Sequence, residues 1–413
     1  MGKTWQANRV YLLICGASSL FFTLVFTVNM IYQAQIVGLN PLQLVLVGTV
    51  LEISALFFEI PTGVVADVYS RRLSVIIGMF LIGAGFIIEG VPTFGMVLLS
   101  QVVWGIGSTF ISGAQDAWIA DEIGNESATP LYIRGAQVGQ FVSIIAIIFS
   151  VGLGSLNLQL PIVLGGIGFI LLGITLIFIM PEDGFSPVPR QERTSWRDLF
   201  QTLSEGIRLI RSQRVLVMIL LISLGYGLYS ESFDRLWTPH LLSFNFPFAA
   251  QIPEVFWFGG ISIVLSVLGI IAAEIIRRRV NMGHSHTLAG LLGLLYGLTA
   301  LGSIAFALTG SFWVAVIFYL VTATARAAAG PLFPAWLNQH TESSVRATVH
   351  SIAAQANAFG QIVIGPAIGT IGLVAGLRTA LTIGGIALLP VVWLITRTRR
   401  IYNPNRADVV TTP

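Results

Sequence analysis

The chain has 413 residues, of which 55% are hydrophobic and 10% are charged, and its formal net charge is +3. Its mean hydropathy is +0.83. Because soluble globular proteins carry about 25% charged residues, this composition excludes an ordinary cytosolic enzyme. A helix that crosses a bilayer needs about 20 apolar residues, so the length accommodates about twelve spans with short loops. The composition therefore indicates a polytopic membrane protein.

Twelve apolar segments follow one another along the chain. They lack the alternation of lipid-facing strands, so they must be helices, which satisfy their own backbone hydrogen bonds. The first segment is too long for a signal peptide and has no cleavage site, so we expect it in the mature protein. The expected spans are 10–34, 41–66, 73–91, 95–120, 133–156, 160–180, 214–238, 255–276, 287–309, 312–338, 347–373 and 379–396.

Lys and Arg are concentrated on one side of the predicted membrane. Nineteen of the 22 lie in segments that twelve alternating spans place on the side of the N-terminus. Because cytoplasmic loops carry an excess of these residues, we expect both termini to be cytoplasmic and the protein to lie in the inner (cytoplasmic) membrane. The same bias explains the basic pI without a nucleic-acid partner, and we expect a monomer.

A long polar segment divides the chain into two halves. We expect an N-terminal six-helix bundle over 1–180, a linker over 181–213, a C-terminal six-helix bundle over 214–396 and a cytoplasmic tail over 397–413. Apolar residues at helical spacing within 196–210 predict an amphipathic helix in the linker. This helix lies either at the membrane interface or in solvent.

The two halves carry a degenerate internal repeat, as expected for a fold that arose by duplication. The segment 63–72 after the second span and the segment 273–279 after the eighth each hold an acid followed by two bases at the same spacing. The fourth span ends Asp-Ala-Trp-Ile-Ala-Asp, and the tenth ends Pro-Ala-Trp-Leu-Asn-Gln. An ordered series of weak matches of this kind indicates two related bundles.

On these residues the chain resembles the major facilitator superfamily over 10–396, and within it the bacterial drug and solute exporters. The segment from Gly63 to Arg72 is similar to the signature loop G-x-x-x-D-x-x-G-R-R/K, with Ser70 in place of the second glycine and Val68 in place of a basic residue. The resemblance implies an all-α membrane protein with twelve transmembrane helices in two pseudo-symmetric six-helix bundles.

The resemblance also implies a cytoplasmic gate around the signature loop. In it Arg71 reaches Asp121 at the foot of the fourth span, and Asp67 faces the start of the eleventh. The alternative is that the loop arginines only determine topology. The predicted gate residues are Glu59, Gly63, Asp67, Arg71, Arg72, Asp121 and Glu274.

Two departures from the exporters stand out. Gln101 occupies the position at which many proton-coupled exporters carry an Arg in the fourth span. The Gly-Pro motif that antiporters often carry in the fifth span is also missing, and a similar segment lies in the eleventh span instead. Both departures weaken the resemblance to proton-antiporting drug exporters in particular.

Four acids within spans are candidates for proton coupling: Glu52, Asp116, Glu231 and Asp234. A charge at mid-bilayer costs at least about 2.5–3.5 kcal/mol, so such side chains should face protein or water. Each has a structural alternative. Glu52 could be a neutral acid in a helix interface, Asp116 could pair with loop bases, and Glu231 could form an i,i+4 outer ion pair with Arg235.

Arg326 is the base nearest mid-membrane and keeps its proton, so it needs an acid or an anionic ligand. Pairing with Glu52 or Glu231 would link protonation to substrate binding. Without a fixed acid, Arg326 would bind an anionic substrate. Further candidates for substrate binding, which could equally hold helices together, are Asn29, Gln33, Gln355, Asn357 and Gln361.

The sequence has no P-loop and no His, Asp or Glu cluster at metal-binding spacing. We therefore expect no cofactor, no metal and no enzymatic activity. The favoured function is proton-coupled efflux of an amphipathic or partly anionic small solute by alternating access. The alternative is an importer or facilitator of a nutrient or lipid-like solute with the same fold. The expected partners are the solute, protons and the bilayer.

Overall fold

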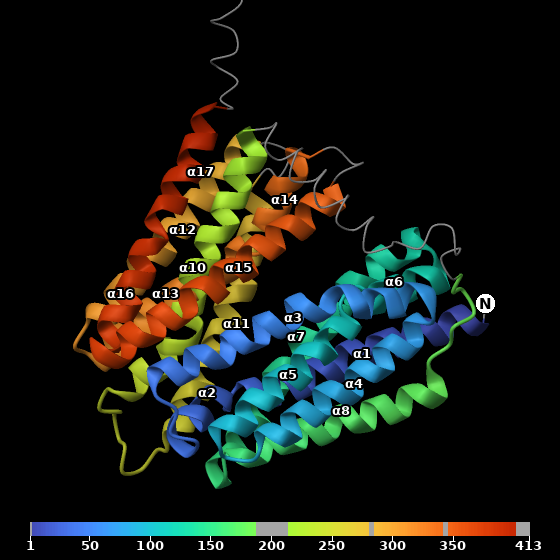
Figure 1. Cartoon of the computed structure of the whole chain (residues 1–413), viewed down its shortest axis with the longest axis horizontal. Helices are drawn as coiled ribbons and strands as arrows, with labels where there is room; N and C mark the ends of the chain where they lie inside the picture. The colour runs from blue at the N-terminus through green and yellow to red at the C-terminus, as the bar shows by residue number, and fades with distance from the viewer. Residues whose placement is uncertain (1, 187–213, 281–284, 342–345, 402–413) are drawn as a thin grey trace, which may run out of the picture. The chain divides into compact units, whose positions relative to one another are not determined.

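A computed structural model describes residues 2–186, 214–280, 285–341 and 346–401, and every regular element in these ranges is a helix (Figure 1). Within these ranges, twelve helices are long and apolar enough to cross a membrane. Each overlaps one of the expected spans, so the predicted all-α architecture of twelve transmembrane helices is confirmed. The amphipathic linker helix expected within 196–210 lies outside the described residues.

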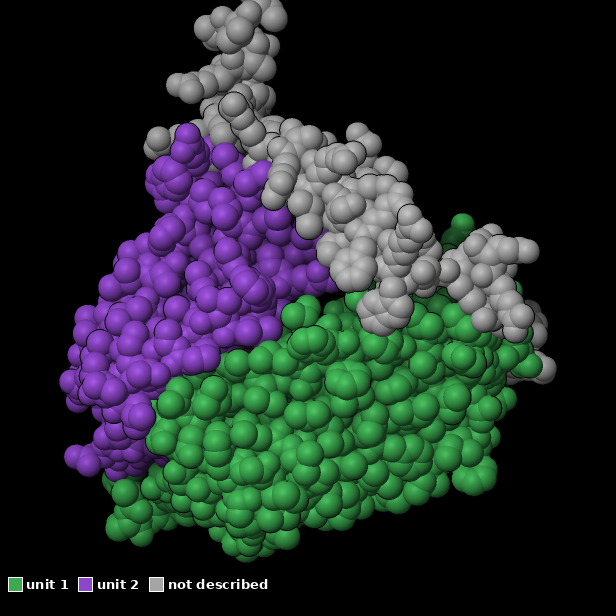
Figure 2. Space-filling view, viewed as in Figure 1, with its two compact units in different colours: residues 1–193, 247–263 green, residues 194–246, 264–413 purple. Residues whose placement is uncertain are grey.

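The chain forms two compact units (Figure 2). Unit 1 comprises 1–193 and 247–263, and unit 2 comprises 194–246 and 264–413. The helices of unit 1 are α1 (Gly2–Phe26), α2 (Asn29–Ile31), the π-helix η1 (Tyr32–Ile36), α3 (Pro41–Val68), α4 (Arg71–Glu89), α5 (Phe94–Ile111), α6 (Ala114–Ile123), α7 (Asn125–Leu156) and α8 (Gln159–Ile179).

The helices of unit 2 are α10 (Arg214–Leu242), α12 (Ser285–Leu308), α13 (Phe312–Ala329), α14 (Leu332–Gln339), α15 (Arg346–Val374), α16 (Leu377–Ala387) and α17 (Leu389–Ile401). The helix α11 (Glu254–Arg279) is divided, because its residues up to Ile263 group with unit 1. Within unit 1, Val151 of α7 fills the space in front of Gly259.

Side chains of the loops define where several spans begin. Asn40 starts α3 with a capping box, in which its Oδ1 accepts from the Gln43 N–H at 2.9 Å and its own N–H donates to Gln43 Oε1 at 3.0 Å. Ser70 Oγ accepts from the Leu73 N–H at 2.8 Å and so caps α4. Such caps satisfy amide groups that a helix leaves open at its first turn.

The fourth and tenth spans are each interrupted at matching positions of the sequence repeat. The fourth breaks at Ser112 and Gly113, where the glycine has φ +72°, between α5 and α6. The tenth breaks at Gly330 and Pro331, between α13 and α14. Interrupted helices expose backbone groups and side chains to cavities in transport proteins. The residues around these two breaks are therefore candidates for a binding site.

Candidate functional site

Unit 2 contains a cavity of about 370 Å³ beside the break in the tenth span. Four spans contribute to its wall, through α10, α12, the α13–α14 pair and α15. Most of the wall is apolar or small, and a few polar side chains converge on it, as in small-molecule sites generally. The lining residues that matter below are Ser223, Tyr226, Tyr296, Arg326, Phe333 and Asn357.

Arg326 is the charged group of this cavity, and it is neutralised by Asp234 of α10. Its two terminal nitrogens donate to the two Asp234 oxygens at 2.5 and 2.8 Å, and its Nε donates to the Tyr226 hydroxyl at 3.2 Å. The Arg326 side chain is 18% exposed and the Asp234 side chain 46%. Such a bidentate pair is the strongest geometry for these two groups.

Local structure favours a cation at this place. Arg326 lies in the last turn of α13, where the helix dipole stabilises positive charge. Its guanidinium carbon also lies 5.9, 5.5 and 5.4 Å from the ring centres of Tyr226, Tyr229 and Phe233, within the range of cation–π attraction.

The acid beside Arg326 is one that the sequence analysis did not name as its partner. The structure pairs this side chain with Asp234, so it is not left for a ligand alone. Glu231 instead faces Arg235 one turn along α10, with 3.5 Å between Oε1 and Nε. Asp234 and Glu231 lie three residues apart on α10, so their side chains leave the helix in neighbouring but different directions. For this reason the two acids meet different arginines.

Three polar residues, Ser223, Asn357 and Gln361, are linked by hydrogen bonds near the crossing of α10 and α15. Asn357 Nδ2 donates to the Ser223 carbonyl at 3.4 Å, and Gln361 Nε2 donates to Asn357 Oδ1 at 2.8 Å. Asn357 and Ser223 line the cavity, whereas Gln361 supports Asn357 from the next turn. Gln355, the other amide predicted on α15, is half-buried and does not line this cavity.

Two glycines allow α10 and α15 to cross at backbone distance. A Cβ atom on Gly227 would lie 2.1 Å from the Asn357 carbonyl oxygen, and one on Gly360 would lie 2.4 Å from the Leu224 carbonyl oxygen. Real Cβ contacts are never this short, so only glycine fits at either position. The crossing places Asn357 against Ser223, and small residues are the usual means of such close approach in membranes.

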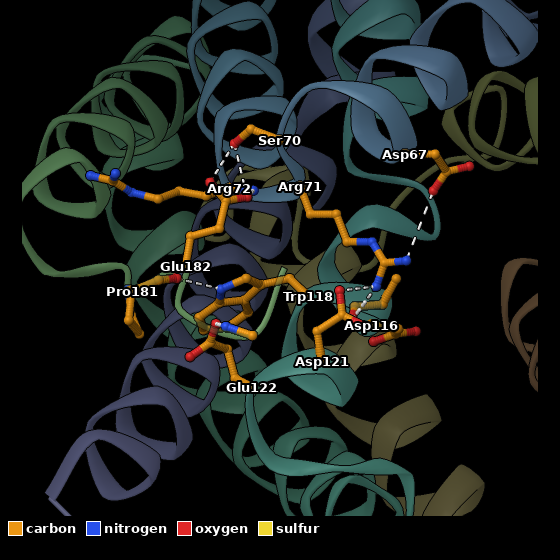
Figure 3. Close-up of polar contacts among 12 residues, drawn as sticks. Asp67, Ser70, Arg71, Arg72, Asp116, Trp118, Asp121, Glu122, Pro181 and Glu182 are labelled. Carbon is orange, nitrogen blue, oxygen red and sulfur yellow. Dashed lines mark hydrogen bonds and ion pairs between the residues drawn. The ribbon is translucent and has the colours of Figure 1, made fainter. Parts of the chain in front are cut away.

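Unit 1 brings together the charged residues of the signature loop (Figure 3). Arg71 forms a short ion pair with Asp121 of α6, donates to the Ala117 carbonyl at 2.8 Å, and lies 4.0 Å from Asp67. Its side chain is 20% exposed. The structure thus places Arg71 between an acid of α3 and an acid of α6. The resemblance implied the contact with Asp121, whereas it implied that Asp67 faces the start of the eleventh span.

The first residues of the linker pack against this loop (Figure 3). Glu182 accepts from the Ser70 hydroxyl at 2.8 and 2.7 Å and from the Arg72 N–H at 2.9 Å. The Pro181 carbonyl accepts from Trp118 Nε1 at 2.6 Å. Ser70, which replaces the glycine of the family pattern, therefore ties the linker to the signature loop.

Of the remaining gate residues, Glu59 and Gly63 belong to unit 1 and Glu274 belongs to unit 2. Glu59 is exposed on α3, and nothing lies within 4 Å of a Cβ placed on Gly63. Glu274 pairs with its own helix, where Arg277 donates twice to its oxygens at 2.7 Å. Asp116 accepts from the Tyr11 hydroxyl at 3.3 Å. Glu52 lies half-buried in α3.

Asn29 and Gln33 belong to a buried polar network with Glu89. Gln33 Nε2 donates to Asn29 Oδ1 at 2.9 Å and to Glu89 Oε1 at 2.6 Å. Their exposures are 5%, 1% and 0%. The network joins the first span to α4 beside the π-helix η1, so both amides are engaged with protein groups in this structure.

Sequence reasoning missed Glu89, Glu182 and Ser223. Glu89 ends an apolar run and resembles a boundary residue, although its burial shows a place in the protein interior. Glu182 falls in a segment with linker composition. A search for metal sites among the described residues finds no group of three His, Cys, Asp or Glu side chains.

Among the described residues, twelve helices long enough to span a membrane, interrupted spans and a mostly apolar cavity with a few polar groups are typical of membrane transporters. The sequence profile of the Major Facilitator Superfamily matches residues 12–363, so the chain belongs to this superfamily. An uncharacterized MFS-type transporter of Bacillus subtilis (strain 168), YxaM, is 23% identical over 349 residues, which cover 84% of this chain and 85% of YxaM.

Solved structures share the fold at low sequence identity. The nucleoside transporter NupG (D323A mutant) has a TM-score of 0.79 at 14% identity, with 95% of this chain and 99% of NupG covered. A bacterial homolog of the human lysosomal transporter Spinster, in an inward-facing and unoccupied conformation, has a TM-score of 0.75 at 14% identity, with 96% and 97% covered.

Proposed function

We propose that the chain is a secondary active transporter that moves a small organic solute across the cytoplasmic membrane by alternating access. The cavity of unit 2, with Arg326 in its wall, supports a binding site for such a solute. NupG, which has a similar fold, is named as a transporter of nucleosides, which are small organic solutes. The concentration of Lys and Arg on one side supports cytoplasmic termini.

The observation that carries a coupling mechanism is the bidentate pair between Arg326 and Asp234. A proton on Asp234 removes its charge and leaves Arg326 in need of an anion. An anionic solute on Arg326 in turn displaces the carboxylate and makes it easier to protonate. By linkage each ligand then strengthens the binding of the other by the same factor.

This reasoning favours uptake of an anionic solute together with a proton. Arg326 lines the cavity and Asp234 does not, so a solute in the cavity meets the cation. Because solute and proton bind together, an inward proton gradient drives the solute inward. The importer that the sequence left as the alternative therefore becomes our first proposal.

Proton-coupled export stays as a second proposal, supported by the 46% exposure of Asp234. A cationic or amphipathic solute that reaches this carboxylate would compete with the proton. Competition for one site couples the two flows in opposite directions, as in the proton-coupled export that the sequence favoured for an amphipathic or partly anionic compound.

Proteoliposomes with a pH-sensitive dye inside distinguish the two proposals. After external addition of small carboxylates, anion–proton symport acidifies the lumen beyond protein-free vesicles, and Asp234→Asn abolishes this excess. Addition of organic cations should alkalinise the lumen if export is correct. Glu126→Gln, which alters an exposed carboxyl at the start of α7, serves as a control that should behave as wild type. A lumen pH unaffected by either set of solutes would contradict both proposals.

A further inference from the structure

Ser223 carries an unused hydroxyl in the wall of the cavity of unit 2. The residue is 4% exposed, and within the described part of the chain its Oγ has no hydrogen-bond partner. Two other serines of α10 bond back to their own helix, since Ser230 donates to the Gly227 carbonyl at 3.2 Å and Ser232 to the Tyr229 carbonyl at 2.7 Å. A buried hydroxyl without a partner is unfavourable, so Ser223, which lines the cavity, gains a partner when its side chain turns toward a polar group of a bound solute.

The rest of the wall is suited to a flat ring. Tyr226 and Tyr296 lie stacked, with ring centres 5.3 Å apart and planes at 27°, and Phe333 adds a third aromatic side chain to the lining. Ala329 and Gly330 at the helix break leave neighbouring wall without bulky side chains. Aromatic rings favour offset stacking or edge contacts with other rings, which an aliphatic chain cannot provide.

The size of the cavity is sufficient for a small ring. Its volume of about 370 Å³ lies at the lower end of the range of roughly 300–1,000 Å³ for small-molecule pockets. One ring with a few substituents fits this volume.

The polar groups define two recognition points on such a ring. Arg326 has five N–H groups, of which three donate to Asp234 and Tyr226. The others are available to a carboxylate even before Asp234 releases its bonds. Ser223 Oγ forms the second point, and Asn357 lies beside it with its orientation held by Gln361.

We propose that the cavity binds an aromatic carboxylate with a second hydrogen-bonding substituent, and that Ser223 recognises this substituent. The inference rests on the proposed function for the anion-binding role of Arg326. It adds to that function two features of the solute, an aromatic ring and a second polar group, and it names Ser223 as a residue that determines specificity.

Thermal stabilisation of the purified full-length protein tests the inference with four probes: 4-hydroxybenzoate, benzoate, cyclohexanecarboxylate and 4-hydroxybenzamide. We expect the first to bind most tightly, benzoate more weakly, and cyclohexanecarboxylate and the uncharged amide least. Ser223→Ala should remove about a 5–10-fold preference for 4-hydroxybenzoate over benzoate, the equivalent of one hydrogen bond. Ser230→Ala, which alters a buried hydroxyl bonded to its own helix, should keep that preference.

The outcomes separate this inference from the proposed function. Equal binding of benzoate and cyclohexanecarboxylate, no binding of any probe, or a Ser223→Ala variant that keeps the hydroxyl preference would each overturn the inference. A melting temperature of the free variant close to wild type shows that it has folded. Hydroxybenzoate binding that does not strengthen as the pH falls, and that Asp234→Asn leaves unchanged, would contradict proton coupling and leave the recognition of an aromatic acid standing.

Discussion

Arg326 and Asp234 are held together by two parallel hydrogen bonds across α10 and α13, although 92 residues separate them in the sequence. The base borders the cavity, and the acid is the more exposed partner. A pair of this kind presents either a neutral surface or, once the acid is protonated, a cation. This relationship places a charge switch at the wall of a solute-sized cavity.

Asp234→Asn should destabilise the protein by stranding the charge of Arg326. Loss of one partner from a fully buried pair costs about 3–5 kcal/mol, and the partial exposure of Asp234 should reduce this to about 1–2 kcal/mol. Thermal unfolding in detergent measures the change. The double variant Asp234→Asn with Arg326→Gln should recover part of the loss, because no stranded charge remains. Strictly additive effects would show that the two side chains do not interact energetically.

Gly227→Ala should weaken the crossing of α10 and α15. The added methyl group would meet the Asn357 carbonyl at 2.1 Å, so the helices must separate. Overpacking of this kind costs about 1–3 kcal/mol, and the shift of Asn357 should also lower solute affinity. The matched control is Gly260→Ala on α11, where nothing lies within 4 Å of the new atom. If both variants melt at the same temperature, the backbone contact between α10 and α15 is wrong.

Ser70→Gly and Ser70→Ala should separate two roles of this hydroxyl. Glycine at an N-cap costs only a few tenths of a kcal/mol, whereas alanine costs about 1 kcal/mol. Both remove the bonds to Glu182. We therefore expect Ser70→Ala to be the less stable variant, and we expect a double-mutant cycle of either substitution with Glu182→Ala to give a non-zero coupling energy. A cycle with zero coupling energy would show that the linker contact adds nothing to stability.

Gln33→Leu should destabilise unit 1 by removing the donor to the buried Glu89 carboxyl. Loss of one hydrogen bond to a buried carboxyl costs about 1–3 kcal/mol. The variant Gln33→Glu supplies a comparison of similar size in which a second acid meets Glu89, and we expect a larger loss at neutral pH. Unfolding midpoints at several pH values measure both effects. Wild-type stability of Gln33→Leu would instead favour the predicted role of Gln33 in substrate binding, which binding measurements on the same variant can test.

Most of the membrane architecture could be predicted because hydrophobic length is a local property of the sequence. The eighth expected span, 255–276, differs from the helix Glu254–Arg279 by a few residues at its ends. The signature loop likewise led to the contact between Arg71 and Asp121, since the resemblance carried a pairing between known positions. Departures from the pattern were less informative about contacts. The hydroxyl of Ser70 bonds to Glu182, which belongs to a distant segment of the sequence, so its role could not be read from the signature loop alone.

The amino-acid sequence alone determined that the described part of the chain forms twelve helices long and apolar enough to cross a membrane, because about 20 apolar residues must cross the bilayer as a helix wherever they occur. The tertiary structure decided which acid neutralises Arg326, that Asn29 and Gln33 meet Glu89, and that Ser223 keeps a free hydroxyl in a cavity wall. These outcomes depend on how each helix is rotated and where two helices cross. A change of one residue in helical register moves a side chain by about 100° around the helix axis, which composition and spacing along a single span do not specify.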